Sequence, residues 1–509
     1  MPIFMNESSM VTSSHLSSKH PETDIGSIYT QDPGPRRFKI LGLEPLLLRR
    51  ILHLGWPVVI GMLSQTAINT VDLLFIGRLP EEIAVPGTAA VLSSIILLWA
   101  FGGFLSSISV GTQAISARRF SEGNWLAAGR VLTNAIAVSI IAAVFVMALA
   151  EFLVEPLMAL LSPSTAVQRL GTSYSRIRFG GLLSMALMAS YKSFYDGVGR
   201  VRIHMTIAIL MNIVNITLCY FLVFGFSVFG FTLKPMHVEG AALGAVLSSY
   251  FGLLLMVIWS LRKEDRLNFG VYRLKHLNLK VAFAVAKLSF WSGLATVILM
   301  AGVGLFNHIV GLIDQLEGVD AINSSAASII IHVMMLVFMS CLAFGTSTAT
   351  LVSQSIGAKV PNLAERYGWQ SVLLAVYSVS FLGFFAFLFP EPILRIFMPK
   401  EVTHVSALKD AVVALAIPSL KLTIGLLAPL AAAAMVLTQA LYGAGKTRYV
   451  MVVEFLLHFG CLVPLAWILG VVCRFGLFGC WLAAVVYVAL LLLATGIKFW
   501  RGQWKETII

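Results

Sequence analysis

Three polar residues recur on one face of the first long apolar segment of the chain. Gln65, Asn69 and Asp72 are spaced by four and three residues, which places their side chains on the same side of a helix. A polar stripe on an otherwise apolar helix is expected to line a cavity, because lipid would leave these groups without partners. A carboxylic acid there can bind a proton in one state of the protein and release it in another. We therefore predict that Asp72 is an ion-coupling residue and that Gln65 and Asn69 line a cavity.

The alternative interpretation of Asp72 is structural, because Arg78 follows closely and both residues could anchor the helix end at an interface.

Asn212 and Asn215 lie one turn apart on one face of a later apolar segment. We predict that they line the same cavity. The competing interpretation is hydrogen bonding between two helices, which is worth under ~2 kcal/mol in membranes.

The composition indicates which kind of element carries these residues. Charged residues make up 12% of the 509-residue chain, about half the share in a soluble domain, and 58% are hydrophobic. This excludes an ordinary cytosolic enzyme and a disordered scaffold. The net charge of +12 is typical of basic loops in a membrane protein, so we predict no nucleic-acid binding. The five cysteines form no CxxC pair, and we predict no disulfide, metal site or cofactor.

The apolar residues gather in runs that are each long enough to cross a bilayer as a helix. The sequence predicts twelve such spans, at about 51–77, 89–115, 129–151, 174–195, 203–226, 240–261, 288–313, 326–353, 369–389, 411–440, 449–472 and 476–498. With the N-terminus inside, 24 Lys and Arg residues flank the inner side and nine flank the outer side. This bias predicts cytoplasmic termini in a multi-pass protein of the plasma (cell inner) membrane.

Two local matches relate the halves of the chain on either side of a charged linker. An offset of 236 aligns 125–130 with 361–366, where a helix restarts after a turn in both halves. An offset of 246 aligns the GxG[R/K]xR turns at 197–202 and 443–448. Because each half has an even number of spans, the repeats are parallel. We predict an all-α polytopic membrane protein of twelve helices, in two six-helix lobes related by a pseudo-two-fold axis along the membrane normal.

The domain organisation follows from the repeat. We predict a polar, disordered cytoplasmic tail over 1–49 and an N-lobe of helices 1–6 over 50–261. A cytoplasmic linker over 262–287 leads to a C-lobe over 288–509, which holds helices 7–12 and a short cytoplasmic tail.

Two histidines are the candidates in the second half. The offset of 236 carries Asp72 onto His308, and histidine titrates near neutral pH, so we predict a second ion-coupling residue there. His332 in the eighth span is predicted to line the cavity. The alternative for both is a hydrogen-bonded histidine near a helix end.

The chain resembles the multidrug and toxic compound extrusion (MATE) family over roughly residues 50–500. The residues that carry the resemblance are Trp56-Pro57, Val71-Asp72, the run 76–79, both GxG[R/K]xR turns, Asn215 and the run 238–242. The resemblance implies twelve helices in two lobes and export of organic, often cationic, compounds in exchange for H⁺ or Na⁺. It also implies that Asp72 is the acidic coupling residue of the first helix.

The chain departs from the family pattern at two places. One branch of the family has an aspartate four residues after the residue like Asn215, but this chain has Cys219. The sodium-coupled branch has a glutamate in the seventh helix, but 289–308 contains no carboxylate, and the expected place falls near Ala301. The first departure indicates that Asp72 acts without the usual acidic partner in the N-lobe. The second counts against a sodium site of that type in the C-lobe.

We therefore predict a secondary antiporter, not an enzyme, that exports organic and cationic small molecules in exchange for H⁺, with Na⁺ as the less favoured ion. It is expected to act as a monomer in the lipid bilayer. The alternative is a flippase for a lipid-linked saccharide or cell-envelope precursor. Such a flippase needs cationic side chains deep in the helices, and only Lys192 and Lys421 come close.

Overall fold

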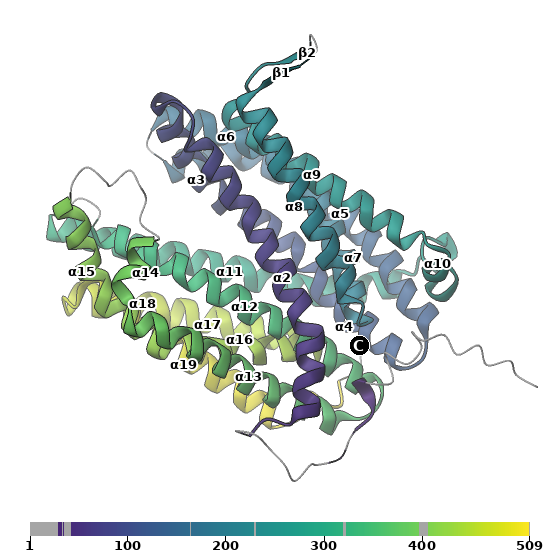
Figure 1. Cartoon of the computed structure of the whole chain (residues 1–509). Coiled ribbons are helices and arrows are strands. Elements are labelled where there is room, and N and C mark those ends of the chain that lie inside the picture. The colour runs from purple at the N-terminus through teal and green to yellow at the C-terminus, as the bar shows by residue number, and fades with distance from the viewer. Residues whose placement is uncertain are drawn as a thin grey trace, which may run out of the picture.

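The computed structural model describes residues 29–32, 34, 42–162, 164–228, 231–318, 322–396 and 406–507, and these form two bundles of long helices (Figure 1). The first bundle comprises α2 (Pro45–Ile76), α3 (Glu81–Ser106), α4 (Ile108–Ser121), α5 (Trp125–Leu161), α6 (Thr165–Phe179), α7 (Leu182–Gly197), α8 (Val201–Phe224) and α9 (His237–Ser260). The short helix α10 (Lys263–Phe269) and the 3₁₀ turn η1 (Leu274–His276) lead to the second bundle.

The second bundle contains helices of similar length. Its elements are α11 (Leu279–Glu317), α12 (Ile322–Gly357), α13 (Pro361–Leu388), α14 (Pro390–Ile396), α15 (Ser406–Leu422), η3 (Thr423–Leu427), α16 (Ala428–Gly443), α17 (Thr447–Leu457), η4 (His458–Leu462), α18 (Val463–Trp467), η5 (Ile468–Val472) and α19 (Gly476–Trp500). The elements η3, η4 and η5 are π-helical turns that continue the helices around them.

The twelve predicted spans are helical in the described part of the chain, which confirms the all-α polytopic fold. Eleven described segments are long and apolar enough to cross a membrane. The twelfth crossing is α6 followed by α7, which is interrupted at Gly180-Gly181 and carries Arg176 and Arg178 near the break. Those polar residues lower its hydropathy, so the crossing is recognised from its place between α5 and α8 rather than from composition.

Two short strands stand outside the predicted helices. Strand β1 (Phe226–Val228) pairs antiparallel with β2 (Phe231–Leu233), with Ser227 opposite Thr232. The hairpin follows Gly225, whose positive φ of 74° turns the chain out of α8. We call the end of the molecule that carries it the hairpin end, and the opposite end, with residues 261–278, the linker end.

The two turns that defined the repeat have the same geometry. Gly199 and Gly445 adopt positive φ angles of 83° and 80°. The next backbone N–H groups, of Arg200 and Lys446, each donate to a carbonyl five residues back, at 2.8 and 2.9 Å. Each turn thus ends one helix and begins the next in the same way, as an internal duplication requires.

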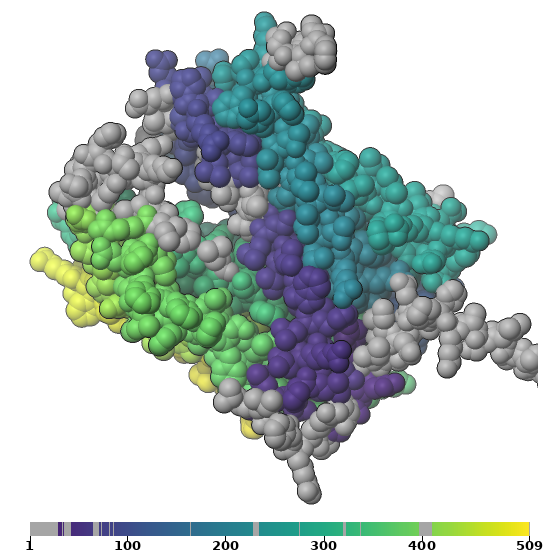
Figure 2. All heavy atoms as spheres, in the orientation of Figure 1, coloured from purple at the N-terminus to yellow at the C-terminus, as the bar shows by residue number. Residues whose placement is uncertain are grey.

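The two bundles converge at the linker end and diverge toward the hairpin end (Figure 1). Figure 2 shows an opening between them on the hairpin side. The contact is made mainly by α2 and α4 of the first bundle with α11 and α12 of the second. Backbones approach closely there, since a Cβ on Gly111 would lie 2.5 Å from the Val285 carbonyl oxygen, and one on Gly357 would lie 2.6 Å from that of Arg118.

Polar side chains tie the bundles together near the linker end. The Gln113 amide donates to the Thr346 carbonyl at 2.9 Å and to the Thr350 hydroxyl at 2.7 Å. The Thr350 hydroxyl in turn donates to the Asp196 carbonyl at 3.1 Å, and the Gln354 amide donates to that of Gly197 at 2.7 Å. The structure is therefore closed at the linker end and open at the hairpin end.

Candidate functional site

Asp72 is the centre of a buried polar cluster near the hairpin end of the first bundle. Its side chain is fully buried, and its two carboxylate oxygens bind different helices. The Tyr174 hydroxyl of α6 donates to Oδ2 at 3.0 Å, and the Cys219 thiol of α8 approaches Oδ1 at 3.5 Å. The carboxyl group is thus held between three helices rather than at a lipid interface.

Asn215 and Cys219 form the α8 side of this cluster. The Asn215 amide donates to the Cys219 sulfur at 3.4 Å, while its carbonyl oxygen is buried with no partner. The Cys219 sulfur also lies 3.6 Å from the Ala241 carbonyl of α9. Helix α9 comes this close because Gly244 has no side chain, since a Cβ there would lie 2.6 Å from the same sulfur. Cys219 thus contacts the Asp72 carboxyl group directly, and Asn215 contacts Cys219 from one turn away on the same helix.

Arg178 supplies the positive charge of the site. It is one turn beyond Tyr174 on α6, and its guanidinium lies 6.0 Å from the centroid of the Tyr174 ring. Its charge is close enough to act on both Tyr174 and Asp72. The site therefore combines an acid, a phenol, a thiol and a guanidinium. Among the described residues, no three His, Cys, Asp or Glu side chains gather as a metal site would need.

Asn212 belongs to a different contact from Asn215. Its amide donates to the Ala208 carbonyl at 2.8 Å and to the Ser64 hydroxyl of α2. This geometry corresponds to the helix-packing interpretation. The carbonyl oxygen of Asn212 is nevertheless buried without a partner, so it remains available to another donor. The structure joins Asn215 to Asp72 only through Cys219, and it joins Asn212 to Ser64.

Gln65 and Asn69 share α2 with Asp72, but their side chains lie outside the described part of the structure. Their predicted role in lining a cavity stays a prediction.

The two histidines of the second bundle do not join the Asp72 cluster. His308 is exposed on α11, and His332 is exposed on α12, with its Nδ1 atom 2.7 Å from the Ser328 carbonyl oxygen. His308 is therefore exposed where Asp72 is fully buried. Their predicted roles are left without a structural partner in the described chain.

The sequence analysis identified neither Tyr174 nor Arg178 as a site residue. A signal was present, because the two lie four residues apart at the start of a predicted span and so share a helix face. It also left Glu454 and His458 on α17 and η4 without a role. The structure buries His458 at 1% exposure, with its Nδ1 atom 3.3 Å from the Tyr487 hydroxyl.

Comparisons with known proteins agree with this fold. The MatE family model matches residues 57–221 and 315–468, which is more than half of the chain. A probable multidrug resistance protein NorM from Thermotoga maritima is 25% identical over 471 residues, covering 91% of this chain and 95% of that protein.

Solved structures show the same fold at low sequence identity. A MOP superfamily transporter from Pyrococcus furiosus superposes with a TM-score of 0.80 at 17% identity, covering 95% of this chain and 99% of that one. A multidrug resistance MATE family transporter in an outward-facing conformation gives 0.77 at 18% identity, covering 94% and 98%. Taken with the family match, these likenesses show that the chain belongs to the MATE family of multidrug efflux transporters.

Proposed function

We propose that this transporter exports organic, cationic small molecules in exchange for H⁺, with Asp72 as the proton-carrying residue. The observation that carries the proposal is the burial of Asp72 between α2, α6 and α8, with Tyr174 and Cys219 on its two oxygens. An ionisable residue inside a membrane helix is costly and marks an ion pathway by default.

The surroundings of Asp72 favour H⁺ over Na⁺. A hard metal cation is held by several oxygen ligands. Asp72 instead faces two donors, the Tyr174 hydroxyl and the Cys219 thiol, while Arg178 brings a positive charge that repels a cation. The Asn215 carbonyl is the free oxygen of the cluster. A proton needs no such coordination shell and fits the site as it stands.

The orientation follows from charge. The linker end carries the flanks in which Lys and Arg are concentrated, so we assign it and both termini to the cytoplasm of a plasma (cell inner) membrane. The hairpin end, where the lobes diverge, then opens outward. Asp72 lies near that end and takes up its proton from outside in this state. The transporter acts as a monomer.

The flippase alternative is less well supported. It requires free cationic side chains inside the bundle to hold a diphosphate. Lys192 is paired with Asp196 at 3.0 Å, and Lys421 is exposed near the hairpin end, 5.7 Å from the Phe387 ring centroid. Neither lysine is placed to bind an anionic headgroup between the lobes.

The test is ethidium efflux from proteoliposomes under an imposed pH gradient or an imposed Na⁺ gradient. We expect the pH gradient to drive efflux in the wild type and not in Asp72→Asn. Asp410→Asn removes an exposed carboxylate, the partner of Arg395, and is the matched control with wild-type efflux. Efflux driven by Na⁺ alone would overturn the choice of ion. A lack of efflux across a panel of organic cations would overturn the substrate class.

A further inference from the structure

Glu454 is an ionisable residue on the inward face of α17 that the proposed cycle does not use. Met451 and His458, on the same stripe, are 8% and 1% exposed, whereas Phe455 and Leu456 on the other faces are 48% and 60% exposed. Glu454 lies between the two buried residues and is itself half-buried. Its side chain therefore reaches accessible space on the inside of the bundle, about 10 Å along α17 from Thr447 at ~1.5 Å per residue.

The residues around Glu454 are aromatic and polar. Tyr442 of α16 and Tyr487 of α19 lie within electrostatic reach of its carboxyl group. Helix α11 contributes Ile298, which packs in one cluster with Met451, and Gly302. The π-helical turn η4 contributes His458 and the buried Cys461.

His458 fixes one wall of this region. Its Nδ1 atom lies 2.8 Å from the Glu454 carbonyl oxygen and 3.3 Å from the Tyr487 hydroxyl, and the two rings are 4.6 Å apart. A Cβ on Gly302 would fall 2.3 Å from His458 Cδ2, so α11 leaves room for this ring only because residue 302 is a glycine. Because Nδ1 faces a backbone carbonyl oxygen, it carries a proton and donates it to that oxygen.

Within the described residues, Glu454 has no ion pair. A carboxylate in a membrane helix without a counter-charge is unfavourable. It is stabilised either by a proton or by a cation that arrives from outside the protein. Tyrosine rings beside a carboxylate suit an organic cation, because the ring faces attract positive charge.

We propose that Glu454 is a second site, in the C-lobe, where a proton and an organic cation compete. The protonated carboxyl group gives its proton to water as the cation binds, and the carboxylate then pairs with that cation. This inference rests on the proposed function, because it names where the cationic substrate is held. In this proposal Asp72 carries the exchanged proton, and Glu454 binds the positively charged substrate.

The test counts protons released when ethidium binds to the purified protein in detergent. The background is Asp72→Asn, so that Asp72 contributes no proton. We expect about one proton released per ethidium bound. Adding Glu454→Gln should abolish the release and weaken ethidium binding about tenfold. Adding Glu454→Asp should keep the release, which covers the case of a Gln variant that folds poorly.

The matched control is Glu239→Gln, which removes an exposed carboxylate of α9 that binds Ser173 and should change neither quantity. Equal proton release and equal affinity with and without Glu454→Gln would overturn the inference while leaving pH-driven efflux intact. A wild-type protein that binds neither ethidium nor tetraphenylphosphonium would overturn the proposed function as well.

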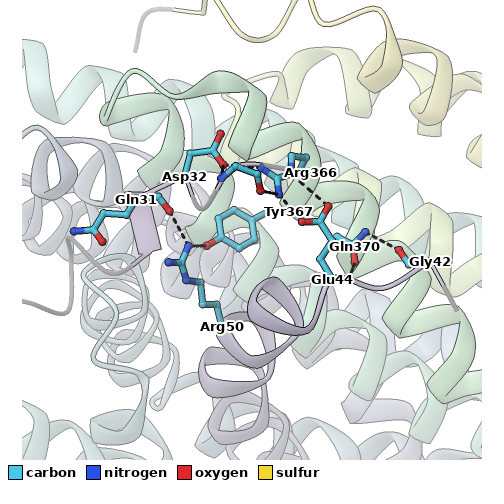
Figure 3. Close-up of polar contacts among 9 residues, drawn as sticks. Gln31, Asp32, Gly42, Glu44, Arg50, Arg366, Tyr367 and Gln370 are labelled. Carbon is cyan, nitrogen blue, oxygen red and sulfur yellow. Dashed lines mark hydrogen bonds and ion pairs between the residues drawn. The ribbon is translucent and has the colours of Figure 1, made fainter. Parts of the chain in front are cut away.

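A second inference comes from the segment before α2. We call the described residues before α2 the strap; they are 29–32, 34 and 42–44. The strap precedes the N-lobe in the chain but binds α13 of the C-lobe (Figure 3). Arg366 of α13 binds Asp32 at 2.6 Å and also pairs with Glu44, which is nearly buried. The Gln370 side chain accepts from the Glu44 backbone N–H at 2.8 Å and donates to the Gly42 carbonyl at 3.0 Å.

The start of α2 extends this contact. Arg50 donates to the Tyr367 hydroxyl and to the Gln31 carbonyl, both at 3.0 Å (Figure 3). The Tyr367 hydroxyl donates to the Tyr29 carbonyl at 3.0 Å. Burial raises the pKa of Tyr29 to about 12, so its hydroxyl stays protonated and bonded to His53. Leu47, Ile51 and Leu54 join Leu363 and Tyr367 in one apolar cluster across the lobes.

We infer that the strap is a latch that holds the linker end closed and must release α13 before that end can open. The test uses distance measurements between spin labels at Glu122 and Lys359, two exposed linker-end positions on different lobes, in a background without the exposed Cys473. Glu44→Gln is expected to add a population at longer distance.

The control is Glu365→Gln, next to Arg366, which breaks the ion pair with Lys505 inside the C-lobe and should leave the distances unchanged. Identical distance distributions in Glu44→Gln and the wild type, or equal shifts in both variants, would overturn the latch.

Discussion

The two lobes have matching turns, but the acidic residues inside them have different surroundings. The N-lobe acid, Asp72, is on the first helix of its lobe, and it lies beside Arg178 and two hydrogen-bond donors. The C-lobe acid, Glu454, is on the fifth helix of its lobe and has no ion pair among the described residues. The offset of 246 places His458 on Asn212, so equivalent positions hold a packed histidine and a packed amide.

The difference shows that two lobes with the same backbone turns can carry acidic residues at different positions and in different surroundings. In the N-lobe, Asp72 is fully buried and hydrogen-bonded, which suits a group that exchanges only a proton. In the C-lobe, the acid is half-buried among tyrosines, which suits a group that also meets a cation. Substitutions that exchange these features between the lobes should change the transport properties in opposite ways.

The largest expected effect is on the packing of the C-lobe site. Gly302→Ala places a methyl group where the His458 ring lies, at 2.3 Å from Cδ2. Overpacking of this kind costs about 1–3 kcal/mol, so the unfolding temperature in detergent should fall and ethidium binding should weaken. Gly304→Ala, with nothing within 4 Å of its new Cβ, is the control and should be at least as stable as the wild type. Equal melting of the two variants would refute this account of Gly302.

The next effect is a change of ion at the N-lobe site. Cys219→Asp puts a second carboxylate where the sulfur now lies 3.5 Å from Asp72 Oδ1. Two carboxylates and the free Asn215 oxygen would supply the oxygen ligands that a metal cation needs. We expect efflux to become stimulated by Na⁺. Cys219→Ser, which keeps a donor of similar size, should stay driven by the pH gradient alone, and Na⁺ stimulation of both variants would argue against the role of this position.

A smaller effect is expected from the phenol of the N-lobe site. Tyr174→Phe removes one hydrogen bond to Asp72 and leaves the ring in place. The loss of about 0.5–1.5 kcal/mol corresponds to roughly two- to tenfold slower pH-driven efflux. Tyr250→Phe removes an exposed hydrogen bond to the Gly180 carbonyl and serves as the control, with efflux like that of the wild type.

The smallest effect is expected at His308. Because this side chain is exposed and is joined to no cluster in the described chain, His308→Asn should change pH-driven efflux less than about twofold. A loss as large as that of Asp72→Asn would show that the second lobe carries a proton through His308 and would restore the symmetric interpretation.

The sequence predicts the fold well because membrane spans depend on local composition. Eleven described helices are long and apolar enough to cross a membrane, the α6–α7 crossing is recognised from its place between its neighbours, and the GxG turns predict the repeat. Local composition also identifies Asp72, because an acidic residue stands out in an apolar span. It fails for Arg178, because a basic residue near a span end is expected to reach the interface, and only the fold shows it beside Asp72.

Contacts between distant segments could not be predicted from the sequence. The tail predicted over 1–49 was judged from its polar composition, which does not reveal that Asp32 and Glu44 meet Arg366 more than 300 positions later. The match of Asp72 with His308 assumed no gap over a whole helix, and a small shift in phase moves a side chain to another face. Long-range pairing and helix rotation are set by packing, not by local sequence.

The most direct test of the account is the number of protons exchanged per ethidium in proteoliposomes, recorded with a pH dye in the lumen while ethidium efflux is followed. The account predicts that proton and ethidium fluxes are coupled in the wild type. Asp72→Asn should lose the proton that Asp72 exchanges, so the ratio of protons to ethidium should fall below that of the wild type. An unchanged ratio of protons to ethidium in Asp72→Asn would contradict the central claim that Asp72 carries the exchanged proton.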